Sequence, residues 1–164
     1  MRRRSSDRDD GLAAIEAVYR ERFAGLVRLA RAVTGEEQTA LDAVHEGFVR
    51  AVRYRDGLRD HESVAGWISR IVLNEARRSR RAVPVRALQE IPEAVANGHG
   101  ERDAVRAALA ALPERQRLAL FLRYYADLDY AGIAEALGVA RGTVSATLHA
   151  AHANLQVQLM EVKR

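Results

Sequence analysis

The chain has 164 residues, and 48% of them are apolar, which is enough for a hydrophobic core and too many for a disordered chain. It has no cysteine, which excludes disulfide frameworks, thiolate metal sites and cysteine nucleophiles. The net charge of +4 points mildly to nucleic acid as a partner. This basic excess lies in residues 1–81, which carry +4, whereas residues 101–164 carry only +1.

The sequence offers no segment suited to a membrane. No apolar run reaches the roughly 20 residues of a membrane-spanning helix. The opening stretch MRRRSSDRDDG is charged and is followed by no long apolar run, so it does not fit a signal peptide. We therefore expect a cytoplasmic protein that makes no membrane contact. Aromatic residues make up only 5%, a composition that favours helices over sheets.

Residues 12–81 carry three amphipathic stripes that are typical of packed helices. In the first, apolar residues recur every three or four positions from Leu12, through Tyr19 and Phe23, until Gly35 ends the pattern. The second stripe runs from Leu41 to about Tyr54. With short joints between the stripes, residues 12–81 are predicted to form a compact helical bundle.

The joint before the third stripe is polar. Residues 53–63 contain Gly57 and are predicted to be a loop. Asp60 is the predicted cap of the third helix, whose apolar face includes Trp67. Ahead of the bundle, residues 1–11 are expected to form a disordered tail.

The helical pattern breaks after residue 81. Residues 82–102 are predicted to be a flexible linker, because the stretch holds Pro84, Pro92, Gly98 and Gly100 and shows no sustained period. Helical signal resumes in residues 103–164, and no pair of strands is visible. The fold class is therefore all-α, with two small helical domains joined by the linker.

The second domain carries the spacing of a helix-turn-helix. Asp129 is placed to cap a short helix, and Gly138 follows its last apolar residue as a left-handed stop. Ala134, Gly138 and Val144 supply a small residue at the helix crossing, a glycine turn and an apolar anchor for the second helix. The same spacing also occurs in simple helical hairpins, which do not bind DNA.

Both halves resemble one known family. The segment ALAALPERQRLALFLRYYADLDYAGIAEALGVARGTVSATLHAAHANL is similar to region 4 of the extracytoplasmic-function (ECF) sigma factors. The first half is similar to their region 2 through FAGLVRLARAVTG, LDAVHEGFVRAV and WISRIVLNEARRSRR. The resemblance runs from about Tyr19 to Leu159, and the two segments in this order are specific to the family.

The resemblance implies a dissociable subunit of bacterial RNA polymerase that binds promoter DNA. In the family, region 2 binds the clamp helices of the largest subunit and melts the −10 element. Region 4 binds the flap of the second-largest subunit and places its recognition helix at the −35 element. The linker threads towards the active centre. Bond formation belongs to the polymerase, so no enzymatic activity is expected of this chain, and an anti-sigma factor is a further candidate partner.

The chain departs from the family pattern at several positions. Where the core-binding helix of the family often has Glu and Gln, this chain has Leu41 and His45. Arg78 replaces an Asp that is common after the Asn of region 2. The Lys and Arg often found after Thr-Val in the recognition helix are replaced by residues 145–147, Ser-Ala-Thr. We therefore expect region 4 to anchor DNA phosphates weakly.

The first turns of the last helix hold the candidates for reading the −35 element. Arg can bond guanine through two hydrogen bonds, hydroxyl groups suit several base edges, and methyl groups suit thymine. Alternatively, some of these side chains only pack or face solvent. The candidates are Arg141, Thr143, Ser145, Ala146, Thr147 and His149.

A second candidate site lies in the first domain. DNA melting needs stacking surfaces for unpaired bases and cations for the strands. By resemblance, the loop of residues 54–62 holds a flipped −10 base. The alternatives are that Trp67 belongs to the core, that Asn74 bonds the local backbone and that the arginines only face solvent. The −10 and phosphate candidates are Tyr54, Arg55, His61, Trp67, Asn74, Arg77, Arg78, Arg80 and Arg81.

By the same resemblance, the second helix carries the polymerase-binding face, although a solvated charged face would have the same composition. The candidates are Asp42, His45, Glu46, Val49 and Arg50. His149 and His152 lie one turn apart but have neither Cys nor a nearby carboxylate, so no metal and no cofactor is expected. The sequence holds no nucleotide-binding loop and no nucleophile elbow.

Two other functions compete with a sigma factor. One is a stand-alone helix-turn-helix regulator whose first domain dimerises or senses a ligand. The other is a protein-binding decoy that sequesters a sigma antagonist. A stand-alone regulator has no need of the LDAVHEGF and NEARRSRR segments of the first half, which therefore favour the polymerase subunit over it.

Overall fold

The computed structural model describes residues 3–81 and 99–162, and within them the chain is all-helical. The first domain consists of α1 (Arg3–Thr34), α2 (Glu37–Arg53), the short 3-10 helix η1 (Arg55–Asp60) and α3 (Val64–Arg81). The second consists of α4 (His99–Ala111), α5 (Glu114–Tyr124), α6 (Tyr130–Leu137) and α7 (Arg141–Val162). The predicted fold class, two small helical domains on either side of a linker, is confirmed.

The first three helices form a bundle around a fully buried apolar layer. Leu29 of α1, Val44 of α2 and Ile68 of α3 are each 0% exposed. Burying such a side chain contributes about 1.5–3 kcal/mol. Gly47 lets α2 approach α3 closely, because a Cβ at this position would lie 2.7 Å from Cγ2 of Val72. Most of the apolar stripe residues therefore lie in the core, although Leu12 and Tyr19 are exposed.

The first helix begins at Arg3 rather than at Leu12, so it extends into the predicted tail of residues 1–11. Gly11 is buried, and a Cβ there would lie 3.8 Å from the carbonyl oxygen of Arg55 in η1. Once a helix is nucleated, each added residue costs little, and residues 3–10 contain neither Pro nor Gly. Gly11 therefore packs against η1 at the start of the apolar stripe of α1.

The predicted loop at residues 53–63 contains the 3-10 helix η1. The cap of α3 is Ser63 rather than Asp60, since Ser63 Oγ accepts a hydrogen bond of 3.0 Å from the amide of Gly66. Ser and Asp are both good capping residues, and the one immediately ahead of the first helical residue takes the position. The entry of the chain into α3 is therefore fixed at Ser63.

In the second domain, α4 begins at His99, four residues ahead of the predicted start of this domain at residue 103. Residues 82–98 lie outside the described part of the chain. Arg117 joins α5 to the end of α4, because its buried guanidinium donates to the carbonyl oxygen of Ala110 at 3.2 Å. Burial lowers the pKa of Arg117, an effect that the nearby Glu114 opposes.

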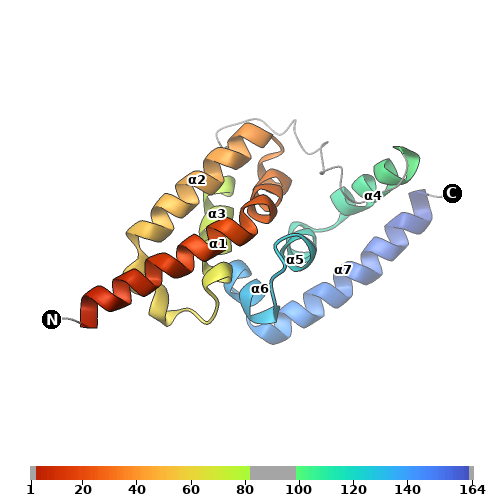
Figure 1. The fold of residues 1–164 in the computed structure, drawn as a ribbon. Coiled ribbons are helices and arrows are strands. Elements are labelled where there is room, and N and C mark those ends of the chain that lie inside the picture. The colour runs from red at the N-terminus through yellow and green to blue at the C-terminus, as the bar shows by residue number, and fades with distance from the viewer. Residues whose placement is uncertain (1–2, 82–98, 163–164) are drawn as a thin grey trace.

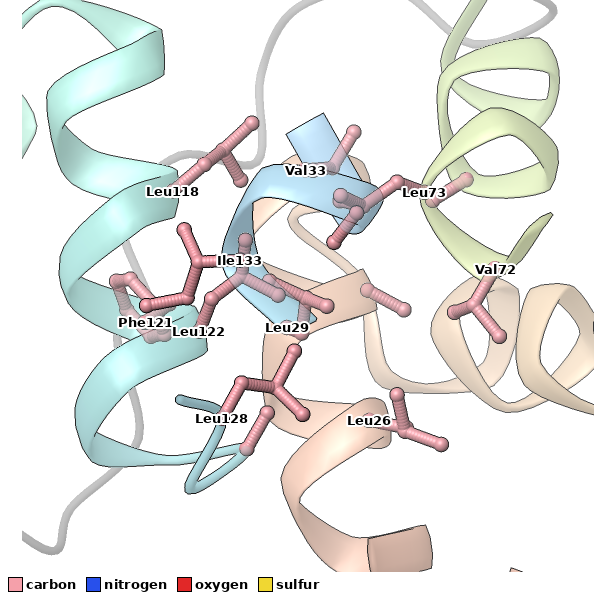
Figure 2. Packing of buried hydrophobic residues seen from close by; sticks show 14 of the residues in the cluster. Leu26, Leu29, Val33, Val72, Leu73, Leu118, Phe121, Leu122, Leu128 and Ile133 are labelled. Carbon is pink, nitrogen blue, oxygen red and sulfur yellow. The ribbon is translucent and has the colours of Figure 1, made fainter. Parts of the chain in front are cut away.

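The two domains pack against each other, which the sequence patterns did not predict. α3 lies against α6, and α1 contacts α5. In Figure 1, α6 sits beside the three-helix bundle while α7 runs away from it towards the C-terminus. Leu29 of α1 lies near Leu122 of α5 and Ile133 of α6 in one continuous apolar cluster (Figure 2). In the described residues, no helix is long and apolar enough to cross a membrane.

Candidate nucleic-acid interface

The helix-turn-helix has the geometry that its residues predict. Asp129 caps α6 by accepting a hydrogen bond of 2.8 Å from the amide of Gly132. Gly138 ends α6 in the left-handed conformation with φ of 66°, which residues with a Cβ rarely adopt. Val144 of α7 is 0% exposed and fixes the second helix against the first. These local signals set the direction in which α7 leaves the turn.

One face of α7 is buried and the opposite face is exposed to solvent. Val144, Leu148 and Ala151 point inward at spacings of four and three. Thr147 is half-buried, and its hydroxyl donates to the carbonyl oxygen of Thr143 at 2.7 Å, so it offers less to DNA than a free hydroxyl would. The remaining −35 candidates are exposed along the opposite face: Arg141, Thr143, Ser145, Ala146 and His149.

Arg141 does not project freely into solvent. Its guanidinium pairs with the carboxylate of Glu62, which lies between η1 and α3 in the other domain. Both side chains remain more than half exposed, at 57% and 63%. Arg141 can therefore exchange Glu62 for another partner without leaving a buried charge unpaired.

The −10 candidates around η1 divide by burial. Tyr54 is 59% exposed, whereas Arg55 donates to the carbonyl oxygen of Val52 at 2.8 Å. Trp67 is only 8% exposed and belongs to the core cluster. His61 stacks on its ring at a centroid distance of 5.3 Å and hydrogen-bonds Glu135 of α6 through Nδ1 at 3.0 Å. In this arrangement Trp67 supports His61 and has no free face for a base.

The polar face of α3 carries the remaining −10 candidates. Asn74 is exposed, and Arg77 donates to Glu114 of α5 at 3.2 Å. Arg78 donates to Glu75 of its own helix at 3.5 Å. Arg80 is half-buried, and the side chain of Arg81 lies outside the described part of the structure. The arginine cluster is thus partly neutralised by carboxylates.

The polymerase-binding candidates lie along one side of α2. Asp42, His45, Glu46 and Val49 are exposed, with Val49 at 52%. Arg50 differs from them, because it bonds the nearly buried Glu75 of α3 at 3.1 Å as well as Glu46 at 3.4 Å. Arg50 therefore supports the bundle in addition to any role at a surface.

Two aromatic residues of α1 extend this surface, and the sequence patterns had assigned both to the core. Tyr19 is 42% exposed and packs edge-on against Phe48 of α2 at a centroid distance of 4.9 Å. Phe23 lies 5.8 Å from the ring of His45. Both residues follow the period of the buried stripe. The sequence alone therefore could not show that Tyr19 is exposed in the folded bundle.

The histidines of α7 are engaged separately. His152 hydrogen-bonds the carbonyl oxygen of Leu148 through Nδ1 at 2.7 Å and the hydroxyl of Tyr124 through Nε2 at 2.9 Å. His149 is exposed on the outer face. Among the described residues, no group of three or more His, Cys, Asp or Glu could hold a metal ion.

Comparisons with known families match both halves of the chain. Residues 18–83 match the family "Sigma-70 region 2", and residues 102–155 match "Sigma-70, region 4". The RNA polymerase sigma-E factor of Streptomyces avermitilis is 30% identical over 151 residues, covering 88% of this chain and 84% of that protein. The ECF RNA polymerase sigma factor SigL of Mycobacterium tuberculosis is 31% identical over 162 residues, covering 92% and 91%.

Two solved structures have a similar fold. CnrH, in complex with the cytosolic domain of CnrY, gives a TM-score of 0.66 at 22% identity and covers 94% of this chain and 97% of its own. The sigma factor RpoE from Bartonella quintana, in complex with the anti-sigma factor NepR, gives 0.63 at 21% identity, covering 95% and 97%. At these identities the likeness concerns the fold alone.

Proposed function

The chain belongs to the ECF sigma factors, which initiate transcription as non-catalytic subunits of bacterial RNA polymerase, and we propose how its surfaces divide that work. Residues 12–81 act as region 2, which binds the polymerase clamp and melts the −10 element. Residues 103–164 act as region 4, which binds the flap and reads the −35 element. We assign sequence reading to α7 on one observation: its face opposite the buried anchor Val144 is exposed.

At the −35 element, Arg141 supplies the strongest base contact. It is exposed at the first turn of α7, where a recognition helix meets base edges. Ser145 and His149 follow on the same exposed face, whereas the Thr147 hydroxyl is bonded to its own helix. Because Arg141 is the only fixed cation of this face, we propose that α7 selects sequence and leaves most of the affinity to other contacts.

At the −10 element, the surface from η1 to the end of α3 receives the separated strands. Tyr54 offers an exposed ring for base stacking, and Asn74 offers an exposed amide. Arg77 and Arg80 supply cations for phosphates. Trp67 takes the role of a buried support beneath His61, in keeping with its 8% exposure.

The clamp-binding surface is the exposed side of α2, extended by Tyr19 of α1. Asp42, Glu46 and Val49 combine acidic and apolar groups on that side. Partly exposed aromatic groups are enriched at protein interfaces, where they bury a large area at a low cost in side-chain entropy. An anti-sigma factor is a further proposed partner, since the two structures of similar fold are complexes with CnrY and NepR.

Run-off transcription from a randomised promoter library tests this function. Core polymerase with the chain should select templates that share two short elements, and core polymerase alone should select none. A stand-alone regulator would give the opposite pattern, with selective DNA binding by the free chain and no transcript that depends on it. The region 2 match disfavours that alternative.

A further inference from the structure

Three exposed side chains form a line along the outer face of α7. Ser145 and His149 follow Arg141 at successive intervals of four residues, which places them on one side of a helix. All three are exposed, whereas Val144 and Leu148 are buried on the opposite side. The helix therefore presents Arg141, Ser145 and His149 together to any ligand that covers this face.

This face carries little permanent charge. Arg141 is the only Lys or Arg between the start of α7 and Val162, and its guanidinium is paired with Glu62. A protein that binds DNA phosphates gains most of its attraction from such cations. Among the other side chains of α7, only the histidines gain a positive charge near neutral pH. They are His149 and His152.

The two histidines differ in their contacts. Both ring nitrogens of His152 are bonded within the domain, Nδ1 to the carbonyl oxygen of Leu148 at 2.7 Å and Nε2 to the hydroxyl of Tyr124 at 2.9 Å. The ring also packs edge-on against that of Tyr124 at a centroid distance of 5.9 Å. His149 has no hydrogen bond, ion pair or ring contact with the part of the chain that the structure describes. Its ring is therefore available to an incoming ligand.

The helices that pack against α7 place no charged group on His149. These helices are α4, α5 and α6. Their described charged side chains are Arg106 of α4, Glu114, Arg115, Arg117 and Arg123 of α5, and Glu135 of α6. None of these six bonds His149, and the one acid of α7, Glu161, lies about 18 Å further along the helix axis. The ligand that covers this face therefore decides which protonation state of His149 is favoured.

Its position along the helix brings His149 to the phosphates rather than to the bases. At 1.5 Å of rise per residue, His149 lies about 12 Å further along the axis than Arg141. A recognition helix meets base edges with its N-terminal residues, and the major groove is about 12 Å wide and about 8.5 Å deep. With Arg141 at the base edges, His149 is at the rim of the groove, where the phosphates lie.

We propose that His149 is a proton-dependent phosphate contact at the −35 element, which binds the DNA backbone as an imidazolium and takes up a proton from solvent when it does so. The inference rests on the proposed function, because it requires α7 to lie in the major groove. The protonated ring donates from both nitrogens and attracts a phosphate, whereas the neutral ring has one donor and no charge.

This contact makes promoter affinity depend on pH. The protonated form binds, so the contact is fully present at low pH and is lost as the pH rises through the range in which histidine titrates, about pH 6–7. Phosphates carry no sequence information. A change of pH should therefore alter the strength of binding to all promoters by similar factors and leave their ranking unchanged.

Filter binding of holoenzyme to one selected promoter, across a salt series at pH 6 and at pH 8, tests the proposal. His149→Gln keeps a polar side chain without charge, and His149→Arg keeps a cation at both pH values. Both substitutions are tolerated by the fold, because the side chain is exposed. Other groups of the holoenzyme also titrate, so the unmodified chain is compared with each variant on the same core polymerase.

The expected result is a difference that appears only at pH 6. There the salt slope of the unmodified chain should exceed that of His149→Gln by about 0.9, the value for one phosphate contact. Its affinity at moderate salt should be roughly threefold higher, as for an exposed ion pair. At pH 8 both differences should vanish. His149→Arg should exceed His149→Gln in slope at both pH values.

His152→Gln is the matched control, because it removes the other histidine of α7. Both nitrogens of His152 are bonded within the domain, so this variant should keep the change of slope between pH 6 and pH 8 that the unmodified chain shows. This holds even if the lost bond to Tyr124 lowers the affinity itself, because such a structural loss does not alter the number of phosphates neutralised.

Three results would overturn the proposal. The first is an equal slope for the unmodified chain and His149→Gln at pH 6. The second is a difference in slope that persists at pH 8, which would mean a contact without proton uptake. The third is a changed base preference of His149→Gln in the −35 library selection, which would mean that His149 reads a base. Failure of the proposed function would look different, because the unmodified holoenzyme would then bind no promoter selectively at either pH.

Discussion

The guanidinium of Arg141, at the start of α7, pairs with the carboxylate of Glu62, a residue 79 positions earlier in the chain. This pair joins the helix proposed to read the −35 element to the edge of the surface proposed to receive the −10 element. It is exposed on both sides, so its contribution to stability is small, roughly 0–1 kcal/mol. The pair matters because it engages the guanidinium of Arg141, which is the strongest candidate for a base contact.

The first prediction concerns that base contact. Replacing Arg141 with Ala should cost about 1–3 kcal/mol of holoenzyme–promoter binding and relax the preference at one −35 position. Arg141→Lys should keep the charge and still lose selectivity, because an ammonium group lacks the two-donor geometry. Selection from a promoter library randomised at −35 measures both. An unchanged base preference in both variants would show that Arg141 reads no base.

The second prediction concerns the clamp-binding side of α2. Asp42→Lys/Glu46→Lys should abolish assembly with core polymerase while leaving the helical circular dichroism intact, since both side chains are exposed. Glu161→Lys on α7 is a control for charge reversal at an exposed position, with half the charge change of the double variant, and it should assemble normally. Size-exclusion chromatography of the mixtures gives the answer. Normal assembly of the α2 variant would remove these two residues from the interface.

The third prediction separates Arg50 from its neighbours. Arg50→Ala should lower the free energy of unfolding by about 1–3 kcal/mol, because it removes a partner of the nearly buried Glu75. Glu46→Ala, which removes only an exposed helical pair, should cost about 0.5 kcal/mol or less. Urea denaturation followed by circular dichroism measures both. Equal losses would mean that Arg78 alone satisfies Glu75.

The fourth prediction concerns the end of α3. Replacing Arg77 and Arg80 with Ala should flatten the salt dependence of holoenzyme–promoter binding by roughly one to two units, since each phosphate contact releases counterions. All promoters should weaken by similar factors, because phosphates carry no sequence information. Filter binding to two promoters across a salt series tests this. A changed ranking of the promoters at an unchanged slope would contradict a phosphate-binding role.

Local signals in the sequence predicted most of the secondary structure. Asp129 and Gly138 carry their capping roles in their own chemistry, so both ends of α6 followed from local residues. The start of α1 at Arg3 did not follow from the sequence, because its apolar stripe begins only at Leu12. Periodicity also placed Tyr19 in the core, although it lies at the exposed edge of the stripe.

The contact between the domains was outside the reach of such patterns. Gly25 and Gly66 allow the close approach of region 4, but a glycine within a helix does not name its partner. The bonds from Arg22 to the turn after α5 join residues more than a hundred positions apart, and no periodicity encodes such a pair. Only the fold therefore shows which candidate site residues are bonded within the protein and which are exposed.

The division of promoter reading between the two domains is tested most directly by tethered cleavage. A DNA-cleaving iron chelate is attached to the new thiol of Tyr54→Cys in one variant and of His149→Cys in another. The chain lacks cysteine, so no other position is labelled. Holoenzyme formed with each variant is then bound to one promoter obtained from the library selection. The Tyr54 probe should cut around −10 and the His149 probe around −35. Cleavage of one and the same element by both probes would contradict the account.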